Sequence, residues 1–126
     1  MSSTLLDLPC AERHGPDYLE RARRLAPMLK DAADDIEGRR ELPEQIVEAL
    51  IEGGFFKLLI PRSLGGAELH PLTYVQVVEE IGRAEPSVAW SLGQNSGCSM
   101  SAPYLEPAVA REIFGPPRGI LAWGPD

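Results

Sequence analysis

Aromatic residues, cysteines and long apolar runs are all scarce in this sequence, and each shortage excludes a class of protein. Phe, Trp and Tyr make up only 6% of the 126 residues, so the core must be mainly aliphatic, which suits packed helices better than a β-sandwich. The two cysteines, Cys10 and Cys98, match no zinc or redox spacing. No apolar run is long enough to cross a bilayer, and residues 1–8 lack the features of a secretory signal. We therefore expect a cytoplasmic protein.

Basic residues are also few, because 12 Lys and Arg stand against 19 Asp and Glu, which gives a formal net charge of −7. This acidic balance opposes contact with nucleic-acid phosphates and with an anionic membrane surface. The lack of a basic recognition helix opposes a helix-turn-helix regulator. The length and the ordinary hydrophobic content, 44%, indicate one globular domain. We expect this domain to bind neither nucleic acid nor membrane.

Motifs for metal, phosphate or triad chemistry are missing as well. His14 and His70 stand alone, so no histidine pair has metal-binding spacing and no Ser-His-Asp set can be assigned. The glutamates at 79–80 have the helical periodicity of a solvated face. The glycines at 65–66 indicate either a tight turn or a phosphate-binding nest. The sequence therefore predicts no catalytic residue and no metal site within this chain.

Helical periodicity is what the sequence does have, from residue 17 onward. Apolar residues recur three or four apart from Tyr18 to Ile36, with charged residues between them. This spacing predicts an amphipathic first helix, with a kink or break at Pro27. Residues 1–16 show no such period, and we expect them to form a mobile leader that precedes the helical domain.

Prolines and glycines divide the following residues into further helices. Pro43 opens a second helix that ends at Gly53, Pro71 opens a third, Pro86 a fourth and Pro107 a fifth. The apolar face of the third helix is expected to contain Leu72, Val75, Val78 and Ile81.

Two apolar runs have the composition of strands. Residues 55–60, FFKLLI, indicate a short strand or a buried extended segment, and residues 119–123 indicate a second strand. A lone strand cannot satisfy its backbone groups without a neighbour, so the chain is expected to stop within a larger architecture. We predict an all-α bundle of about five helices over residues 17–118 and the start of a truncated β-domain over residues 119–126.

The fourth predicted helix is unusually rich in small residues, with Ala, Ser, Gly or Cys at most positions from 87 to 102. Glycine costs a helix about 1 kcal/mol relative to alanine, so other helices or a ligand must hold this one. Trp90 and the polar residues of this helix form a candidate ligand wall, namely Gln94, Asn95, Ser96 and Ser99, whereas Cys98 by itself indicates a packed, inert thiol. The alternative is close helix packing through Gly93 and Gly97.

A longer pattern spans these features. The run LPEQIVEALIEGGFFKLLIPRSLGGAELHPLTYVQVVEEIGRAEPSVAW, residues 42–90, resembles the N-terminal signature of the acyl-CoA dehydrogenase superfamily. The tail PYLEPAVAREIFGPPRGILAWGPD, residues 103–126, is similar to the branch of two-component flavin-dependent monooxygenases. Classical dehydrogenases of the superfamily have a threonine–glutamate–proline stretch where this chain has Trp123, Gly124 and Pro125. This difference favours the monooxygenase branch.

The resemblance implies a subunit of three parts, namely this helical domain, a middle β-domain and a C-terminal four-helix bundle, assembled as a tetramer. It implies FAD or FMN as cofactor, bound mostly outside this chain, and a flavin reductase as partner in the monooxygenase branch. The substrate would be a small aromatic or hydrophobic molecule, hydroxylated with reduced flavin, or an acyl-CoA that is dehydrogenated. We expect this chain alone to be inactive and to bind flavin weakly.

The resemblance also assigns roles to residues. The small-residue helix would line the substrate pocket. Its candidate substrate contacts are Trp90, Gln94, Asn95 and Cys98. Cys98 stands about where monooxygenase relatives carry a histidine. Flavin contacts would begin at the end of the terminal strand, with the candidates Ala122, Trp123 and Gly124. The alternative function is a non-catalytic helical assembly module that pairs with another subunit, since the terminal strand has no neighbour within the chain.

Overall fold

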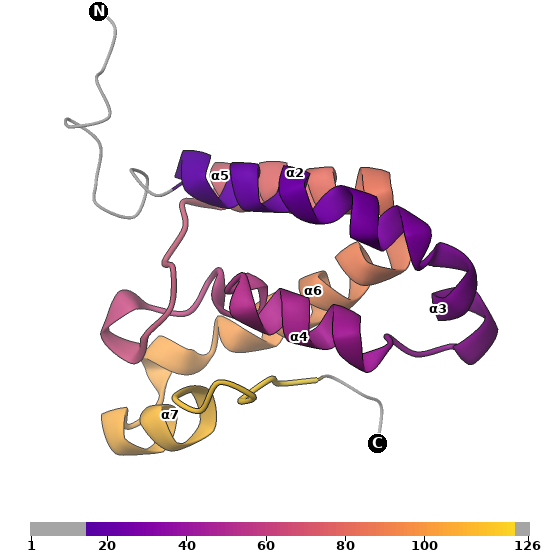
Figure 1. The fold of residues 1–126 in the computed structure, drawn as a ribbon. Coiled ribbons are helices and arrows are strands. Elements are labelled where there is room, and N and C mark those ends of the chain that lie inside the picture. The colour runs from indigo at the N-terminus through magenta and orange to yellow at the C-terminus, as the bar shows by residue number, and fades with distance from the viewer. Residues whose placement is uncertain (1–14, 123–126) are drawn as a thin grey trace, which may run out of the picture.

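The structure, a computed structural model, describes residues 15–122 and is all-α over that range (Figure 1). Its α-helices are α2 (Gly15–Asp31), α3 (Ala33–Arg39), α4 (Glu44–Glu52), α5 (Pro71–Ala84), α6 (Pro86–Ser99) and α7 (Pro107–Phe114). Its 3₁₀ turns are η2 (Phe55–Lys57), η3 (Arg62–Leu64) and η4 (Ala102–Tyr104). None of the helices in this range is long and apolar enough to cross a membrane.

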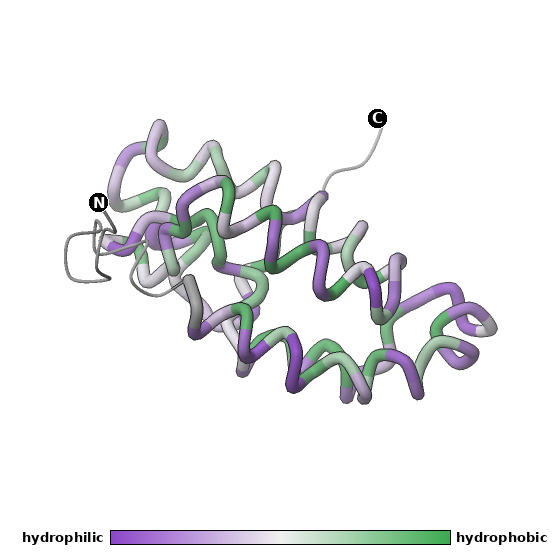
Figure 2. Tube along the Cα trace, turned by 90° about the horizontal axis from the view of Figure 1, so that it is seen from above, coloured by the Kyte–Doolittle hydropathy of each residue, from purple (hydrophilic) through white to green (hydrophobic). Residues whose placement is uncertain are grey.

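The core lies between α2, α5 and α6, and η2 packs against α6 and α4 (Figure 1). Ala22 and Leu29 on α2, Val77 and Ile81 on α5, and Leu92 on α6 are fully buried. Hydrophobic and hydrophilic residues alternate along the helices (Figure 2), as they do in amphipathic helices around a shared core. Because each buried aliphatic side chain stabilises the fold by roughly 1.5–3 kcal/mol, this packing holds α6 firmly from one side.

The first predicted helix is two helices, and the break lies beyond the proline. Pro27 sits inside α2, which runs on past it. At the break, the backbone N–H of Ala32 is shared between the carbonyl oxygens of Met28, at 3.1 Å, and Leu29, at 3.2 Å. Such bifurcated bonds are common at helix ends. The described range therefore contains six α-helices where about five were expected.

Helix α5 buries Ile81, as expected, but the rest of its buried stripe differs from the expected one. Leu72 and Val75 are 62% and 57% exposed, whereas Val77 and Ile81 are fully buried and Tyr74 packs against the core. Apolar residues occur on more than one side of this helix, so periodicity alone could not select the buried stripe. Contact with α2 and with α6 selects it. The assignment of Leu72 and Val75 to the core face was wrong.

The apolar run at 55–60 does not form the predicted strand or extended segment. It begins with the turn η2, packed against α4 and α6, and Leu58 and Ile60 are fully buried. A following loop satisfies its carbonyl groups, because Leu58 accepts from the N–H of Leu69 at 2.9 Å and Ile60 from that of Glu68 at 3.1 Å. A compact turn thus meets the backbone requirement that a strand would have met.

The predicted terminal strand does not form in its described part, residues 119–122. No strand is available as a neighbour in the described range, and a strand needs a ladder partner. The N–H of Leu121 instead donates to Oδ1 of Asn95 on α6 at 3.2 Å. The rest of the predicted β-domain start, 123–126, lies outside the described residues, as does 1–14 of the predicted leader.

Candidate functional site

Helix α6 presents one face to the core and one face outward. It begins at Pro86, where a missing N–H costs nothing, and the Glu85 carboxylate caps it by accepting from the N–H of Ser87 at 3.1 Å. Its buried residues are Val88, Leu92, Asn95, Ser96 and Ser99. The small-residue helix is therefore enclosed on one side by the described residues, and its other side is open.

The second half of the outward face forms a hollow of about 650 Å³, which we call the glycine hollow. Its lining residues are Gly93, Gln94, Gly97, Cys98 and Ser101. A Cβ atom placed on Gly93 or Gly97 would meet no described atom within 4 Å apart from its chain neighbours and the backbone of its own helix. Within the described range, no helix packs closely against these glycines, so they leave a flat strip of exposed backbone beside Gln94 and Cys98.

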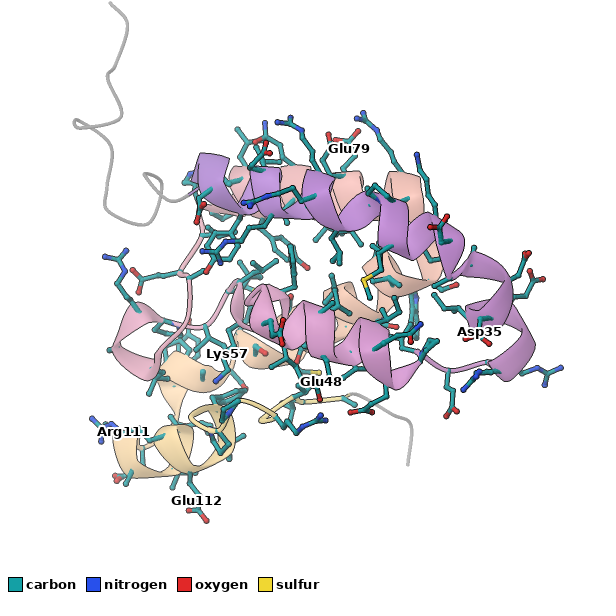
Figure 3. The ribbon with its side chains drawn as sticks, viewed as in Figure 1. Asp35, Glu48, Lys57, Glu79, Arg111 and Glu112 are labelled. Carbon is teal, nitrogen blue, oxygen red and sulfur yellow. The ribbon has the colours of Figure 1, made fainter. Side chains whose placement is uncertain are left out.

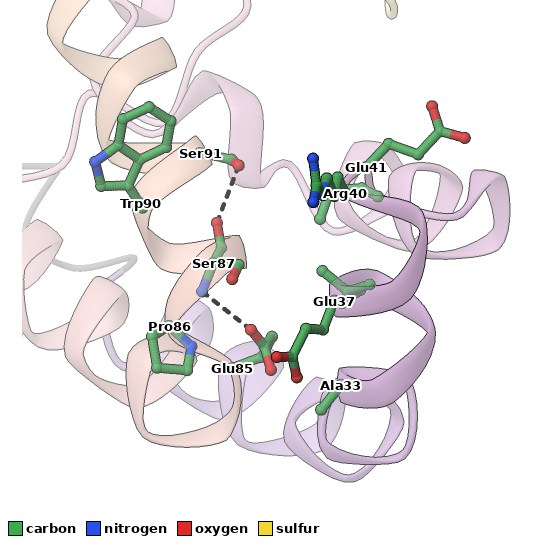
Figure 4. A pocket seen from close by; sticks show the side chains of 11 residues that line it. Ala33, Glu37, Arg40, Glu41, Glu85, Pro86, Ser87, Trp90 and Ser91 are labelled. Carbon is green, nitrogen blue, oxygen red and sulfur yellow. Dashed lines mark hydrogen bonds between the residues drawn. The ribbon is translucent and has the colours of Figure 1, made fainter.

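A second hollow, of about 750 Å³, lies between α3 and the start of α6, and we call it the Trp90 hollow (Figure 4). Trp90 lines it and is 68% exposed. Its charged lining residues are Glu37, Arg40, Glu41 and Glu85. Figure 4 shows the Glu37 side chain directed toward Glu85. Three carboxylates against one guanidinium make this hollow acidic, which disfavours phosphate groups.

Asn95 points into the interior and is 3% exposed. Its Nδ2 donates to the carbonyl oxygen of Phe56 at 2.8 Å, and its Oδ1 accepts from the N–H of Leu121 at 3.2 Å. Both ends of the amide thus have partners inside the protein, as a buried polar group requires. This contact was not foreseen, because nothing in the local pattern of α6 shows which residues approach from η2 and from residues 119–122.

The structure thus divides the four predicted substrate contacts. Gln94 and Cys98 lie together at the glycine hollow, Trp90 lies at the neighbouring hollow, and Asn95 faces the core. Three further lining residues were not predicted as contacts, namely Gly93, Gly97 and Ser101. Gly97 follows Gln94 by three positions, Ser101 follows Cys98 by three, and Gly93 precedes Gly97 by four. This spacing places them on the same helical face, and that signal was available in the sequence.

The predicted flavin contacts lie at the edge of the described range. Ala122 is its last residue and is exposed, and Trp123 and Gly124 lie outside the described residues. No Lys or Arg is among the described residues that line the glycine hollow, so the hollow offers no cation to the phosphates of FAD or FMN. Across residues 15–122, no group of three or more His, Cys, Asp or Glu could hold a metal ion.

A charged side chain that the sequence did not single out connects η2 with α7. The Nζ atom of Lys57 donates to the carbonyl oxygens of Phe114, Gly115 and Pro116 at 2.7, 3.2 and 3.1 Å. Figure 3 shows Lys57 between the central helices and α7. Partial burial lowers the pKa of this ammonium below its usual value. Lys57 therefore fixes where the chain goes after α7.

Sequence comparison with known proteins identifies one family and several relatives. The family model for the acyl-CoA dehydrogenase N-terminal domain matches residues 18–107. The chain is 35% identical over 72 residues, 57% of this chain and 19% of the relative, to the flavin-dependent monooxygenase, oxygenase subunit HsaA, of Rhodococcus jostii. It is 36% identical over 77 residues, 61% and 20%, to the 3-(aryl)acrylate reductase of Clostridium sporogenes. It is 28% identical over 93 residues, 71% and 23%, to the indole-3-acetate monooxygenase of Pseudomonas putida.

The matched residues run from within α2 to the first residue of α7 and include both hollows. The chain spans about a fifth of the length of the curated relatives it matches. The resemblance seen in the sequence is thereby confirmed, because the family model covers well over half of the chain. The chain belongs to the acyl-CoA dehydrogenase family and carries its N-terminal domain.

Proposed function

We propose that this chain forms one wall of the substrate pocket in a flavin-dependent oxidoreductase of the acyl-CoA dehydrogenase type, with a flat aromatic molecule as substrate. The observation that carries the proposal is the glycine hollow on α6. Without Cβ atoms at Gly93 and Gly97, the helix offers a flat surface against which a ring can lie. The Gln94 amide beside it supplies one donor and one acceptor group for polar substituents of the ring.

The relatives support an aromatic substrate and two kinds of reaction. Two of them are named for an aryl acrylate and for indole-3-acetate. The reaction of the full protein is hydroxylation of the ring with reduced flavin, supplied by a reductase, or hydrogen transfer on an acyl-CoA. We favour hydroxylation, because two of the three relatives described above are monooxygenases. The lining of the glycine hollow carries no charged residue, so this wall orients the substrate and excludes water.

The flavin, FAD or FMN, is held by other parts of a full-length subunit in an oligomer. The glycine hollow has no lining cation, and the Trp90 hollow has three carboxylates and one arginine. Neither of these two hollows therefore fits the phosphates of either flavin. We expect the isolated chain to bind neither FAD nor FMN tightly, and a sub-micromolar affinity in a fluorescence titration would contradict this.

Cys98 provides a test of the proposed wall, because its thiol lines the glycine hollow and is partly exposed. A Cys10→Ser chain keeps Cys98 as its single thiol. The rate at which this thiol reacts with an aromatic-free disulfide reagent should fall several-fold when millimolar indole-3-acetate or cinnamate is added. An unchanged rate would overturn the proposal.

Gly97→Leu in the same background is the matched control. The new side chain would occupy the hollow, since a Cβ at this position meets no described atom within 4 Å. The aromatic probes should then no longer protect Cys98. Protection that survives this substitution would place the ring elsewhere and would count against the glycine hollow.

A second function is favoured by the exposed apolar pair on α5, Leu72 and Val75. Neighbouring exposed apolar side chains mark interaction surfaces, and a non-catalytic module that pairs with another subunit would use such a surface. Size-exclusion chromatography distinguishes the outcomes. Self-association that Leu72→Glu abolishes would support the assembly function, and a monomer at every concentration would count against a homomeric form of it.

A further inference from the structure

The residues that follow α7 are held to the helical domain by three separate contacts, and we call residues 115–122 the exit segment. Two of the contacts involve a cation. One is the contact of Lys57 with the end of α7, described above. In the other, Nη2 of Arg118 lies 2.7 Å from Oε1 of Glu44, and it also pairs with Glu48 on the same helix, α4. Arg118 is exposed and Lys57 is partly buried, so salt weakens the Arg118 contact more than the Lys57 contact.

The third contact is neutral, and the side chain that makes it, Asn95, is buried. The Asn95 side chain accepts from the Leu121 N–H and donates to the Phe56 carbonyl oxygen. Its partners are 26 and 39 residues away along the chain. This one amide therefore joins α6, η2 and the exit segment. A buried group that loses its partner costs more than an exposed one, because water does not replace the lost bond.

Asn95 lies on the same turns of α6 as the glycine hollow but on the opposite side of the helix. Gln94 precedes it directly and Cys98 follows three positions later, and both line the hollow. The same turns of α6 thus carry both the glycine hollow and Asn95, the residue that anchors Leu121. The next residue, Ala122, is a predicted flavin contact. The hydrogen bond between Asn95 and Leu121 therefore sets the distance between the proposed substrate wall and this predicted flavin contact.

Building on the proposed function of α6 as a substrate wall, we propose that Asn95 is a positioning residue that fixes the Leu121 backbone relative to the glycine hollow. Asparagine suits this role because its amide supplies a donor for the Phe56 carbonyl and an acceptor for the Leu121 N–H. An ionised aspartate supplies only acceptors and brings negative charge against that carbonyl. A leucine of similar volume supplies neither. The contacts of Lys57 and Arg118 reinforce the position that the buried amide sets.

Hydrogen exchange at the Leu121 amide, measured by NMR on the 126-residue chain, tests this role. Asn95→Ala should accelerate exchange at Leu121 roughly tenfold relative to Ile81 in the core, the change expected for one lost buried hydrogen bond. Ser96→Ala is the matched control, because Ser96 Oγ is buried with no partner among the described residues, and it should leave the ratio unchanged. Equal acceleration at Leu121 and Ile81, or none at Leu121, would overturn the proposal.

A second variant keeps the test open if Asn95→Ala does not fold. In Asn95→Asp, only the protonated carboxyl can both donate to Phe56 and accept from Leu121. Lowering the pH from 7 to about 4 should therefore bring the Leu121-to-Ile81 exchange ratio back toward that of the unmodified chain at the same pH. A ratio that stays high at both pH values would contradict the role. No ligand is present, so the result is independent of whether the hollow binds an aromatic ring.

Discussion

The Nζ atom of Lys57 lies 2.7 Å from the carbonyl oxygen of Phe114, the last residue of α7. The carbonyl groups at a helix C-terminus have no partner within the helix, and a cation there also meets the negative end of the helix dipole. Lys57 therefore supplies both a hydrogen-bond donor for these carbonyl groups and a positive charge for the dipole, and it does so from η2, a turn far away along the chain. The contact determines how α7 docks on the helical domain and hence where the exit segment starts.

Replacing Lys57 with methionine should lower the free energy of unfolding by about 1 kcal/mol, because the carbonyl groups at the end of α7 lose their charged donor while the apolar stem is kept. Urea denaturation measures the change. Lys30→Met is the matched control, because Lys30 lies in the last turn of α2 and is exposed. If Lys57→Met and Lys30→Met lower the free energy of unfolding equally, Lys57 does not stabilise the end of α7 as predicted.

The same ammonium predicts a pH dependence. Burial lowers the pKa of Lys57 in the folded chain below its usual value, so above neutral pH the unfolded chain holds the proton that the folded chain releases. Stability rises with pH wherever the unfolded state binds more protons. The difference in unfolding free energy between the unmodified chain and Lys57→Gln should therefore increase from neutral pH toward the unfolded pKa of about 10.4. A difference that falls over this window would show a pKa raised by folding.

The sequence predicted the all-α class and most helix starts, because prolines and glycines act locally. Pro71, Pro86 and Pro107 each begin a helix as expected. The buried stripe of α5 was predicted only in part. Ile81 is buried as expected, but Val77 is buried in place of Leu72, because the two have similar hydropathy and only the partners α2 and α6 select between them. Tertiary contact overrode a local pattern in this case.

The site was predicted in the same uneven way. The small residues of α6 indicated that other helices or a ligand enclose it, and the helical period places Gln94 and Cys98 on one face. The interior position of Asn95 follows from groups that arrive from Phe56 and Leu121, far apart in the sequence. The terminal strand was wrong in its described part for the same reason, since a strand is defined by a neighbour that local sequence does not reveal.

Glycines in this chain should respond to alanine substitution with opposite signs. Gly93→Ala and Gly97→Ala should each stabilise the chain by about 0.5–1 kcal/mol, because both lie within α6 and a Cβ there meets no described atom within 4 Å. Gly66→Ala should destabilise it, because the new Cβ would collide with the Ile60 carbonyl. Thermal unfolding of the three variants measures this. A loss of stability in Gly97→Ala would mean that another part of the chain packs against α6.

The most direct measurement is an NMR titration of the 126-residue chain with indole-3-acetate, read at the backbone amides. The account predicts that the largest shifts occur at the glycine hollow, at Gly93, Gln94, Gly97 and Cys98, and that Gly97→Leu removes them. It is contradicted if millimolar probe shifts none of these amides. It is equally contradicted if the largest shifts occur at the Trp90 hollow, at Glu37, Arg40 and Ser87.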